Sequence, residues 1–299
     1  MCLIINYPKL CVIVGVPGSG KTTYCESVVK NNSNFKHLSS DLIRKEILGS
    51  EEDQSANERV FHIMQTRALE YLNAGYNVLY DATNINRKSR AAILSKLPLW
   101  VQKEAIICWA PIETCIERDK NRKRSVGKEV IAKMLRNYQV PYFDEGFSRI
   151  TVKHPEGWPE HEQEYRKMLF SDDINQDNPH HTLTLFDHMN KSCEYIKQQY
   201  KNLKDVQDLY YAAMWHDIGK KYCKSFINGK GEKTDVAHYY GHQGYSAWIV
   251  NGLLISSNDI AWLVNNHMDP YLDTRYYRNL PLWLKTKIDI IHEADVYAH

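Results

Sequence analysis

The segment Gly15–Thr22, with the sequence GVPGSGKT, constrains the fold more than any other part of the chain. It follows the apolar run Leu10–Val14 and precedes Thr23–Lys30, which has the composition of a helix. Glycines between a strand and a helix let backbone N–H groups surround phosphate oxygens, and the helix N-terminus adds positive potential. Lys21 can then reach the β- and γ-phosphates, and the Thr22 hydroxyl can ligate Mg²⁺. The pattern predicts a nucleoside triphosphate site in preference to a plain glycine turn.

Five short β-prone runs alternate with helical stretches up to residue 153. They are Leu10–Val14, Lys36–Ser40, Asn77–Asp81, Glu104–Trp109 and Arg149–Lys153. Such alternation predicts a parallel sheet flanked by helices. We expect an α/β domain over residues 1–153, with ATP or another nucleoside triphosphate and Mg²⁺ as its cofactors. The expected nucleotide contacts in the loop are Gly15, Pro17, Gly18, Ser19, Gly20, Lys21 and Thr22.

Polar residues follow two further strands of this sheet. Asp41 comes after the second strand, where a carboxylate can take the proton of an attacking hydroxyl, and Arg44 could hold a phosphate of the acceptor. The alternative is that Asp41 caps a helix while Arg44 lies in solvent. Asp81 ends the third strand and is the candidate to orient Mg²⁺ or its water. Thr83 and Asn84 are candidate contacts to the acceptor or the nucleotide.

A basic run follows the fourth strand. It contains Arg118, Lys120, Arg122, Lys123 and Arg124. Basic runs are usually solvated helix faces, but an arginine lid can neutralise charge on a transferring phosphoryl group. Arg118 and Arg122 are spaced i, i+4 and are expected to share one helix face, so they are the candidate lid residues.

These motifs, taken in order, resemble the 5′-hydroxyl polynucleotide kinase branch of P-loop kinases over about residues 10–153. The resemblance rests on the phosphate loop, Asp41-x-x-Arg44, Asp81-x-Thr83-Asn84, Arg118-x-x-x-Arg122 and the segment Pro141–Phe147. It implies that Asp41 is the general base and that Arg44 binds the phosphate next to the terminal nucleoside. It also implies that Arg122 is the lid arginine and that RNA or DNA ends are the acceptors.

The composition changes after residue 153. Residues 154–178 are rich in Pro, Glu, Asp, Asn and Gln, and we interpret them as a connector. From Thr182 onward the apolar periodicity is helical nearly throughout, so residues 179–299 are expected to form an all-α domain. Nine of the 13 histidines lie between His180 and His299, which indicates a different chemistry in the second half.

Six residues of the second half have the spacing of metal ligands. They are His188, His216, Asp217, His242, His267 and Asp295. The adjacent His216 and Asp217 project from one turn and would share a metal with His188 and Asp295, while the remaining two histidines suffice for a second metal. Each histidine alone is more often a surface or core residue. Imidazoles and carboxylates without a thiolate favour Mn²⁺, Ni²⁺, Co²⁺, Fe or Mg²⁺ over structural zinc.

This pattern resembles the HD phosphohydrolase superfamily over roughly residues 180–299. The resemblance implies that Asp217 bridges two metals and that Lys220 meets the substrate phosphate. Two metals activate a water and clamp phosphoryl oxygens, so hydrolysis of a phosphomonoester or phosphodiester is expected. Four further histidines have no place in the pattern and are interpreted as surface or neighbouring groups; they are His180, His181, His238 and His292.

Charge and hydropathy bear on how the protein could meet nucleic acid and membranes and on where it is located. The formal charge of +2 gives no strong long-range field for nucleic acid, so any polyanion site is local. The longest apolar runs, 10–16 and 105–110, are far shorter than the roughly 20 residues that span a bilayer, so no membrane association is expected. The N-terminus has no export signal, and seven cysteines without a Cys-x-x-Cys pair suit a reducing compartment. A cytoplasmic location is therefore expected.

The two halves together predict a bifunctional enzyme that heals nucleic-acid ends. It would phosphorylate 5′-hydroxyl ends and remove 3′-, 2′- or 2′,3′-cyclic phosphates, leaving ends that a ligase accepts. One alternative is a nucleoside or metabolite kinase joined to a nucleotide phosphohydrolase. Another is a nucleotide-sensing module whose second half hydrolyses nothing.

Overall fold

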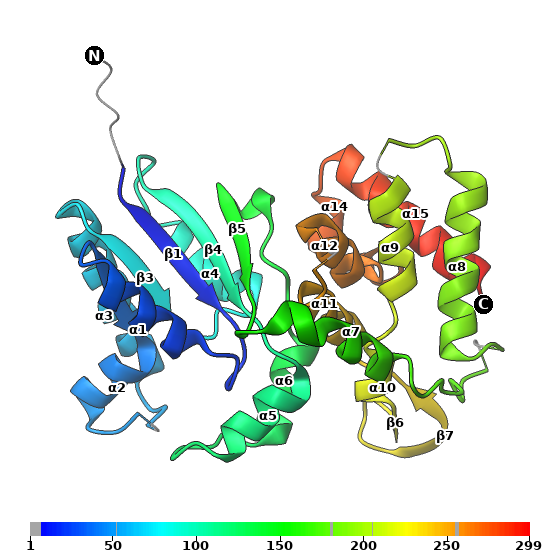
Figure 1. Cartoon of the computed structure of the whole chain (residues 1–299), viewed down its shortest axis with the longest axis horizontal. Helices are drawn as coiled ribbons and strands as arrows, with labels where there is room; N and C mark the ends of the chain where they lie inside the picture. The colour runs from blue at the N-terminus through cyan, green and yellow to red at the C-terminus, as the bar shows by residue number, and fades with distance from the viewer. Residues whose placement is uncertain (1–6, 52, 180–181, 205, 255–256) are drawn as a thin grey trace. The chain divides into compact units, whose positions relative to one another are not determined.

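The computed structural model describes residues 7–51, 53–179, 182–204, 206–254 and 257–299 (Figure 1). The chain divides into two compact units. The first consists of residues up to Ile131 together with Pro141–Pro155, and the second of Ala132–Val140 together with Glu156–His299. The segment 132–140, which lies in the first half of the sequence, therefore packs with the second unit.

The first unit is built on a five-stranded parallel sheet with the strand order β2-β3-β1-β4-β5. The strands are β1 (Lys9–Val14), β2 (Phe35–Ser39), β3 (Asn77–Asp81), β4 (Gln102–Cys108) and β5 (Arg149–Lys153). The central strands are buried because a parallel sheet is covered on both faces. The prediction of five strands alternating with helices is confirmed.

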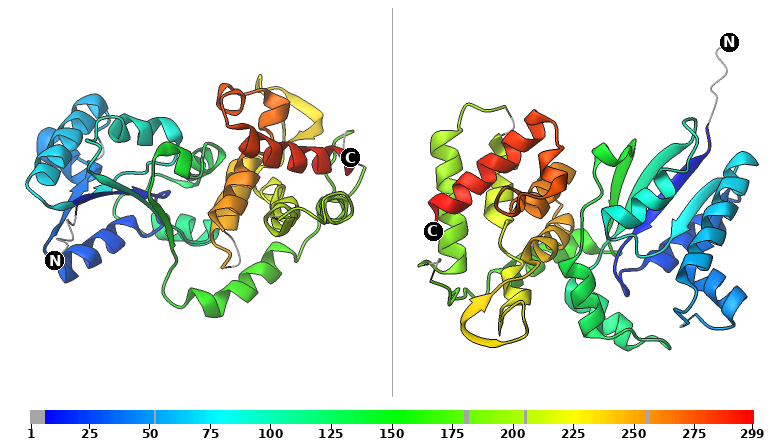
Figure 2. Two further views of the ribbon diagram at one scale, coloured as in Figure 1. Left: turned by 90° about the horizontal axis from the view of Figure 1, so that it is seen from above. Right: turned by 180° about the vertical axis from the view of Figure 1, so that it is seen from behind.

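Helices lie on both faces of this sheet (Figure 2). They are α1 (Lys21–Asn31), α2 (Ser40–Leu48), α3 (Asn57–Asn73), α4 (Arg87–Leu94), α5 (Ile112–Lys120) and the short η1 (Phe143–Glu145). Because all five strands are parallel, their carboxyl ends meet at one edge of the sheet. Ligands of open α/β sheets bind at that edge.

The second unit is mainly helical. Its helices are the end of α6 (Lys128–Arg136), α7 (Trp158–Leu169), α8 (Leu185–Gln199), α9 (Val206–Trp215), α10 (Lys220–Cys223), α11 (His242–Asn251), α12 (Asn258–Asn266), α13 (Asp269–Leu272), α14 (Arg275–Arg278) and α15 (Leu282–Tyr297). Trp248 and Trp262 are fully buried in its core. None of the described helices is both long and apolar enough to cross a bilayer.

The expectation of an all-α second domain is wrong in one segment. β6 (Ser225–Ile227) and β7 (Lys233–His238) form an antiparallel hairpin around residues 228–231. Aromatic and β-branched residues flank an Asn-Gly-containing turn, a pattern typical of a hairpin that overrides the helical tendency of the surrounding sequence. The proposed connector, 154–178, contains α7, which has a proline in its first turn.

Candidate functional sites

The phosphate loop runs from the end of β1 to the start of α1. Gly18 has a φ of +78°, and a Cβ atom there would lie 2.2 Å from the Cys115 carbonyl oxygen, so glycine is required. The Lys21 ammonium donates to the Val16 carbonyl oxygen at 3.0 Å and so folds back over the loop. Thr22 is exposed in the first turn of α1.

The loop also contains a polar atom that a phosphate would satisfy. The Ser19 hydroxyl is buried and has no hydrogen-bond partner among the described residues. Gly15 N donates to the Thr83 carbonyl oxygen at 3.0 Å, which ties the loop to the segment after β3. A buried hydroxyl without a partner is costly unless a ligand occupies the loop.

Asp81 lies at the carboxyl edge of the sheet, beside this loop. In the register it is opposite Ile13 of β1 on one side and Ser39 of β2 on the other. Its Oδ2 atom lies 2.9 Å from His37 Nε2, and a ligand atom of Cys25 is within 4.8 Å of both groups. Neither His37 nor Cys25 belongs to the sequence prediction, because only the fold brings β2, β3 and α1 together.

Asp41 and Arg44 form an ion pair in α2. Arg44 Nη1 donates to Asp41 Oδ1 at 2.7 Å, and Nη2 donates to Asn57 Oδ1 at 3.0 Å. Arg44 is 4% exposed, whereas the Asp41 side chain is 47% exposed. Ser39, not Asp41, caps the helix. The alternative of a capping Asp41 with a solvated Arg44 is therefore wrong, and the buried arginine holds an accessible carboxylate.

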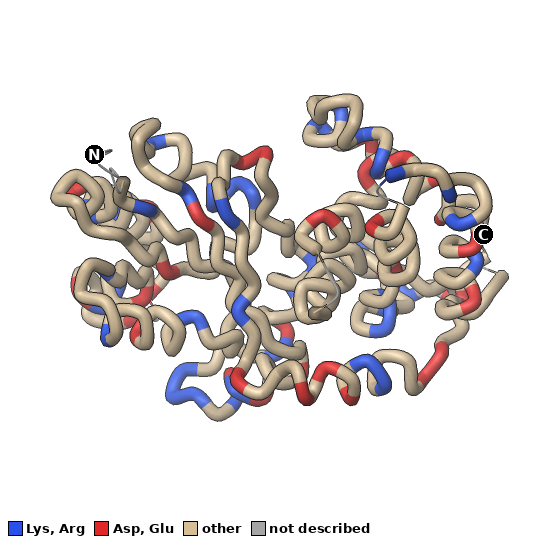
Figure 3. The backbone as a smooth tube through the Cα atoms, turned by 45° about the horizontal axis from the view of Figure 1, so that its top comes forward, with Lys and Arg blue, Asp and Glu red and all other residues tan. Residues whose placement is uncertain are grey.

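Lys and Arg positions follow one another at the end of α5 and in the turn after it (Figure 3). The prediction that Arg118 and Arg122 share a helix face is wrong, because α5 ends at Lys120. Arg118 Nη1 lies 3.4 Å from the Gly18 carbonyl oxygen, and Arg122 is exposed in the turn. Arg118 thus lies beside the phosphate loop, whereas Arg122 lies in the exposed turn after α5.

The buried carboxylate of Asp119 holds this turn. It accepts hydrogen bonds from Ser125 Oγ at 2.7 Å and from Val126 N and Gly127 N at 3.0 Å. The turn carries Arg124, which donates to the Glu51 carbonyl oxygen at 2.6 Å and lies 3.7 Å from Asp41 Oδ1. Sequence reasoning did not single out Asp119 and named Arg124 only as a member of the basic run, since the partners of both residues come together only in the folded turn.

Asn84 stabilises the segment after β3 through hydrogen bonds to the backbone. It is 2% exposed, and its amide donates to the carbonyl oxygens of Ile13, Tyr80 and Ala82. The fully buried Arg90 donates to the Asn84 carbonyl oxygen and to both carboxylate oxygens of Glu145. This placement favours a structural role for Asn84 over a contact to substrate.

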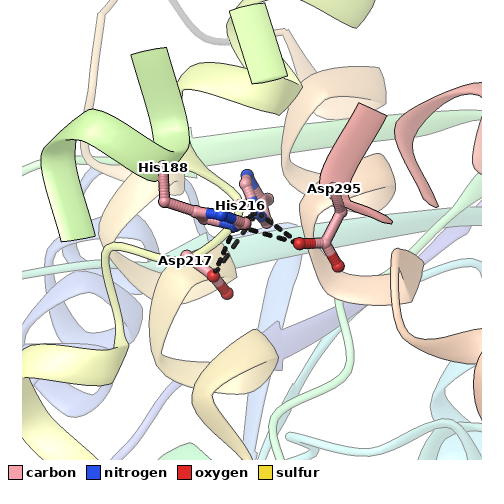
Figure 4. Close-up of side chains that lie close together, drawn as sticks. All are labelled: His188, His216, Asp217 and Asp295. Atoms are coloured by element: carbon pink, nitrogen blue, oxygen red, sulfur yellow. Dashed lines mark hydrogen bonds and ion pairs between the residues drawn. The ribbon is translucent and has the colours of Figure 1, made fainter. Parts of the chain in front are cut away.

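Four of the predicted metal ligands converge in the second unit (Figure 4). His188 comes from α8, His216 and Asp217 from the turn after α9, and Asp295 from α15. All four are buried, and one ligand atom of each lies within 4.8 Å of the others. His188 Nε2 is 2.9 Å from Asp295 Oδ1 and 3.2 Å from His216 Nε2.

A second group shares Asp217 with the first. Asp217 Oδ1 lies 3.1 Å from His242 Nε2 and 3.8 Å from His267 Nε2. Asp217 Oδ2 lies 3.4 Å from Nε2 of both His188 and His216. One carboxylate thus presents one oxygen to each group, which is the arrangement that a ligand bridging two metals requires.

The hydrogen bonds of the imidazoles fit metal ligation. The Nδ1 atoms of three rings lie 2.7 to 2.9 Å from backbone carbonyl oxygens: His216 with Ala213, His242 with Tyr239 and His267 with Val264. A neutral ring that donates from Nδ1 has only a lone pair at Nε2. These Nε2 atoms point into the cluster, as in metal sites whose outer hydrogen bonds fix the ring.

Burial and the neighbouring charges set the protonation of the cluster. Burial, with the charges of His242 and His216, lowers the pKa of His267 to about 3, so this ring is neutral. Burial also opposes charge on His216, but Asp217 and Asp295 outweigh it and raise the pKa to about 10. The pKa of Asp217 is well below its usual range because Lys220 and His216 outweigh its burial. A divalent cation would displace the proton on His216.

Lys220 lies inside this cluster. Its Nζ atom is 2.6 Å from Asp217 Oδ2 and donates to Gln176 Oε1 at 2.8 Å. His299 stacks on His188 with ring centroids 5.5 Å apart, and its Nε2 atom is 3.5 Å from Asp295 Oδ1. Gln176 and His299 were not predicted, because neither has the spacing of a ligand. His180 and His181 lie outside the described residues.

Residues 10–141 match a family model described as an AAA domain. The chain is 24% identical over 147 residues to the transcription factor bHLH140 of Arabidopsis thaliana. The aligned region covers 46% of this chain and 15% of that protein. The chain thus spans about 15% of the length of this curated relative.

Three solved structures are also similar to parts of the chain. A chain of the Pnkp1/Rnl/Hen1 RNA repair complex has 24% identity and a TM-score of 0.40, over 44% of each chain. A fungal RNA kinase has 14% identity and a TM-score of 0.38, over 56% of this chain and 90% of that chain. A gluconokinase from Sinorhizobium meliloti 1021 has 17% identity and a TM-score of 0.35, over 50% of this chain and 83% of that chain.

Proposed function

We propose that this chain is a bifunctional enzyme that repairs nucleic-acid ends. The first unit transfers the γ-phosphoryl group of ATP to a 5′-hydroxyl, and the second removes a 3′-, 2′- or 2′,3′-cyclic phosphate. The observation that carries the proposal is that one chain contains both a phosphate loop and a buried cluster of four histidines arranged around Asp217. A ligase is the expected downstream partner, since it joins the resulting ends.

In the first unit, the loop N–H groups and Lys21 bind the triphosphate. Asp41 accepts the proton of the 5′-hydroxyl. The hydroxyl oxygen then bonds to the γ-phosphorus of ATP, while the bond between that phosphorus and the β–γ bridging oxygen breaks. Mg²⁺ at the Thr22 hydroxyl would neutralise phosphate charge. Arg118, beside the loop, is placed to neutralise the transferring group.

Arg44 has two functions in this proposal. Its Nη1 atom orients Asp41, and its buried Nε atom has no hydrogen-bond partner among the described residues. That free donor is the proposed contact to the phosphate next to the terminal nucleoside. Arg122 remains the proposed lid arginine, and its exposed position leaves it free to approach the nucleotide.

In the second unit, His188, His216, Asp217 and Asp295 would hold one divalent ion, and His242 and His267 would share a second with Asp217. Such ions supply Lewis acidity and lower the pKa of a nucleophilic water. The chain's own residues orient the ligands. Backbone carbonyls fix the imidazoles, and Lys220 holds Asp217 and is the proposed contact to the leaving phosphate.

The test uses one oligonucleotide with a 5′-hydroxyl and a 3′-phosphate, incubated with ATP and Mg²⁺ or Mn²⁺. The proposal predicts that both ends change. A change at the 5′ end alone favours a nucleotide sensor in the second unit. Phosphorylation of free nucleosides without any change to the oligonucleotide favours the small-molecule kinase.

A further inference from the structure

His37 of β2 and Asp81 of β3 lie on the same face of the parallel sheet. In the register of the two strands, His37 is opposite Leu79, which precedes Asp81 by two residues. Side chains alternate between the two faces of a strand, so all three point to one face. The two polar side chains are therefore diagonal neighbours, and His37 Nε2 lies 2.9 Å from Asp81 Oδ2.

Both side chains of this pair are shielded from water. The side chain of His37 is 12% exposed and that of Asp81 is 4% exposed. A carboxylate can only accept hydrogen bonds, so His37 Nε2 carries the proton and donates it. Among the described residues, this is the only hydrogen bond that the Asp81 carboxylate makes. His37 thus fixes the carboxylate through Oδ2, and Oδ1 stays available for a ligand.

The pair lies beside the helix that carries the proposed Mg²⁺ contact. The sulfur of Cys25 in α1 is within 4.8 Å of a ring nitrogen of His37 and of a carboxylate oxygen of Asp81. Thr22 precedes Cys25 by three residues in α1, so the two side chains are neighbours on one face of the helix. Asp81 therefore lies next to the turn of α1 from which Thr22 would bind Mg²⁺.

The alternative is that the hydrogen bond only helps to join β2 to β3. The backbone ladder already joins these strands, from the pair Phe35–Asn77 to the pair Ser39–Asp81. Apolar side chains at both positions would strengthen this contact at a lower cost, because a buried polar pair must give up its water. A buried histidine bonded to a buried carboxylate is thus more than the strand pairing needs.

We propose that His37 is a positioning residue for the metal-assisted binding of ATP. It donates to Asp81 and so orients this carboxylate for the Mg²⁺ that accompanies the nucleotide. The proposal rests on the function proposed above, of which it needs the ATP site and no particular acceptor. Groups that orient a metal-binding carboxylate in this way typically contribute about 10- to 100-fold in metal affinity.

The test measures ATP binding by calorimetry in Mg²⁺ and in EDTA. We expect Mg²⁺ to strengthen binding to the wild type, and His37→Leu to lose about ten-fold or more of this gain while its affinity in EDTA is unchanged. His37→Gln should keep most of the gain, because its amide N–H lies close to the position of the imidazole Nε2–H. His62→Leu is the matched control, since His62 is an exposed histidine of α3.

His37→Asn keeps the test valid if the leucine variant does not fold. Its shorter amide corresponds to Nδ1 and not to Nε2, so it should lose the gain as His37→Leu does. Equal losses in Mg²⁺ and in EDTA would show that His37 only supports the fold, and would overturn the proposal. So would a gain that every variant keeps, or a wild type whose ATP affinity Mg²⁺ does not change.

Assays of 5′-phosphorylation on the same preparations separate this proposal from the proposed function. A wild type that gains ATP affinity from Mg²⁺ through His37, yet phosphorylates no oligonucleotide, would contradict the proposed acceptor and still support the role of His37. Phosphorylation of the oligonucleotide with equal Mg²⁺ dependence in the wild type and His37→Leu would do the reverse.

Discussion

The Nε2 atoms of His242 and His267 lie 3.1 Å apart, although the Nδ1 atom of each ring is already hydrogen-bonded to a backbone carbonyl oxygen. If both rings donate from Nδ1 and carry no proton at Nε2, their Nε2 lone pairs face one another and no hydrogen bond joins the rings. A cation beside Asp217 Oδ1 would bind both lone pairs. The backbone carbonyls beside α11 and α12 thus orient both rings as the proposed metal site requires.

Asp217→Ala is expected to remove both proposed metal ions, because among the described residues Asp217 is the one that belongs to both groups of ligands. His242→Ala should remove only one. Elemental analysis of the purified proteins measures this directly, with His161→Ala as the control, since His161 is an exposed histidine of α7. Equal metal content in Asp217→Ala and His242→Ala would contradict the bridging role.

His299→Ala should weaken metal binding by roughly 10- to 100-fold without removing a ligand. The His299 ring stacks on His188 and approaches Asp295, and partners of this kind orient the ligands they contact. Titration of the metal-free protein with Mn²⁺ gives the affinity. An affinity equal to that of the wild type would show that the stacking contributes nothing.

Gly18→Ala should weaken ATP binding by at least about ten-fold, because the new Cβ atom would strike the Cys115 carbonyl oxygen and displace the loop. Gly49→Ala is the matched control. Gly49 also has a positive φ, of +76°, but a Cβ atom there meets nothing within 4 Å. Calorimetric titration with ATP should therefore distinguish the two variants. Similar affinities in both would argue against a close-fitting loop.

Asp119→Asn is expected to loosen the turn that carries Arg122 and Arg124. Burial opposes the charge of Asp119, but hydrogen bonds from Gly127, Ser125 and Val126 outweigh it and hold its pKa below the ordinary value. A depressed pKa stabilises the fold above the ordinary pKa, and this contribution is lost as the pH falls through the folded-state value.

The destabilisation by Asp119→Asn should therefore be greatest near neutral pH and shrink as the pH falls below about 4. Thermal melting across this range, beside Glu26→Gln at an exposed position of α1, measures the effect. A loss of stability that is the same at every pH would mean that the carboxylate charge is not what holds the turn.

The sheet of the first unit was predictable because each strand is a short β-prone run that lies between helical segments. The convergence of His188, His216, Asp217 and Asp295 was predictable from the adjacent His-Asp pair and the histidine and carboxylate spaced around it, whereas their binding of a metal stays a prediction. Asp119 and His299 could not be predicted in this way. Their roles depend on contacts that exist only after the turn and the terminal helix have folded.

The hairpin was missed for a different reason. Its strands are short, and the helical periodicity on both sides masks them. The Asn-Gly pair at residues 228–229 is the signal that could have located it.

The most direct test of the whole account follows both ends of one oligonucleotide in the wild type, Lys21→Ala and Asp217→Ala. The oligonucleotide carries a 5′-hydroxyl and a 3′-phosphate, and ATP and Mn²⁺ are present. We expect Lys21→Ala to lose only 5′-phosphorylation and Asp217→Ala to lose only phosphate release, since the two residues lie in separate compact units. A wild-type protein that binds metal yet leaves the 3′-phosphate in place, or that leaves the 5′-hydroxyl unmodified, would contradict the account.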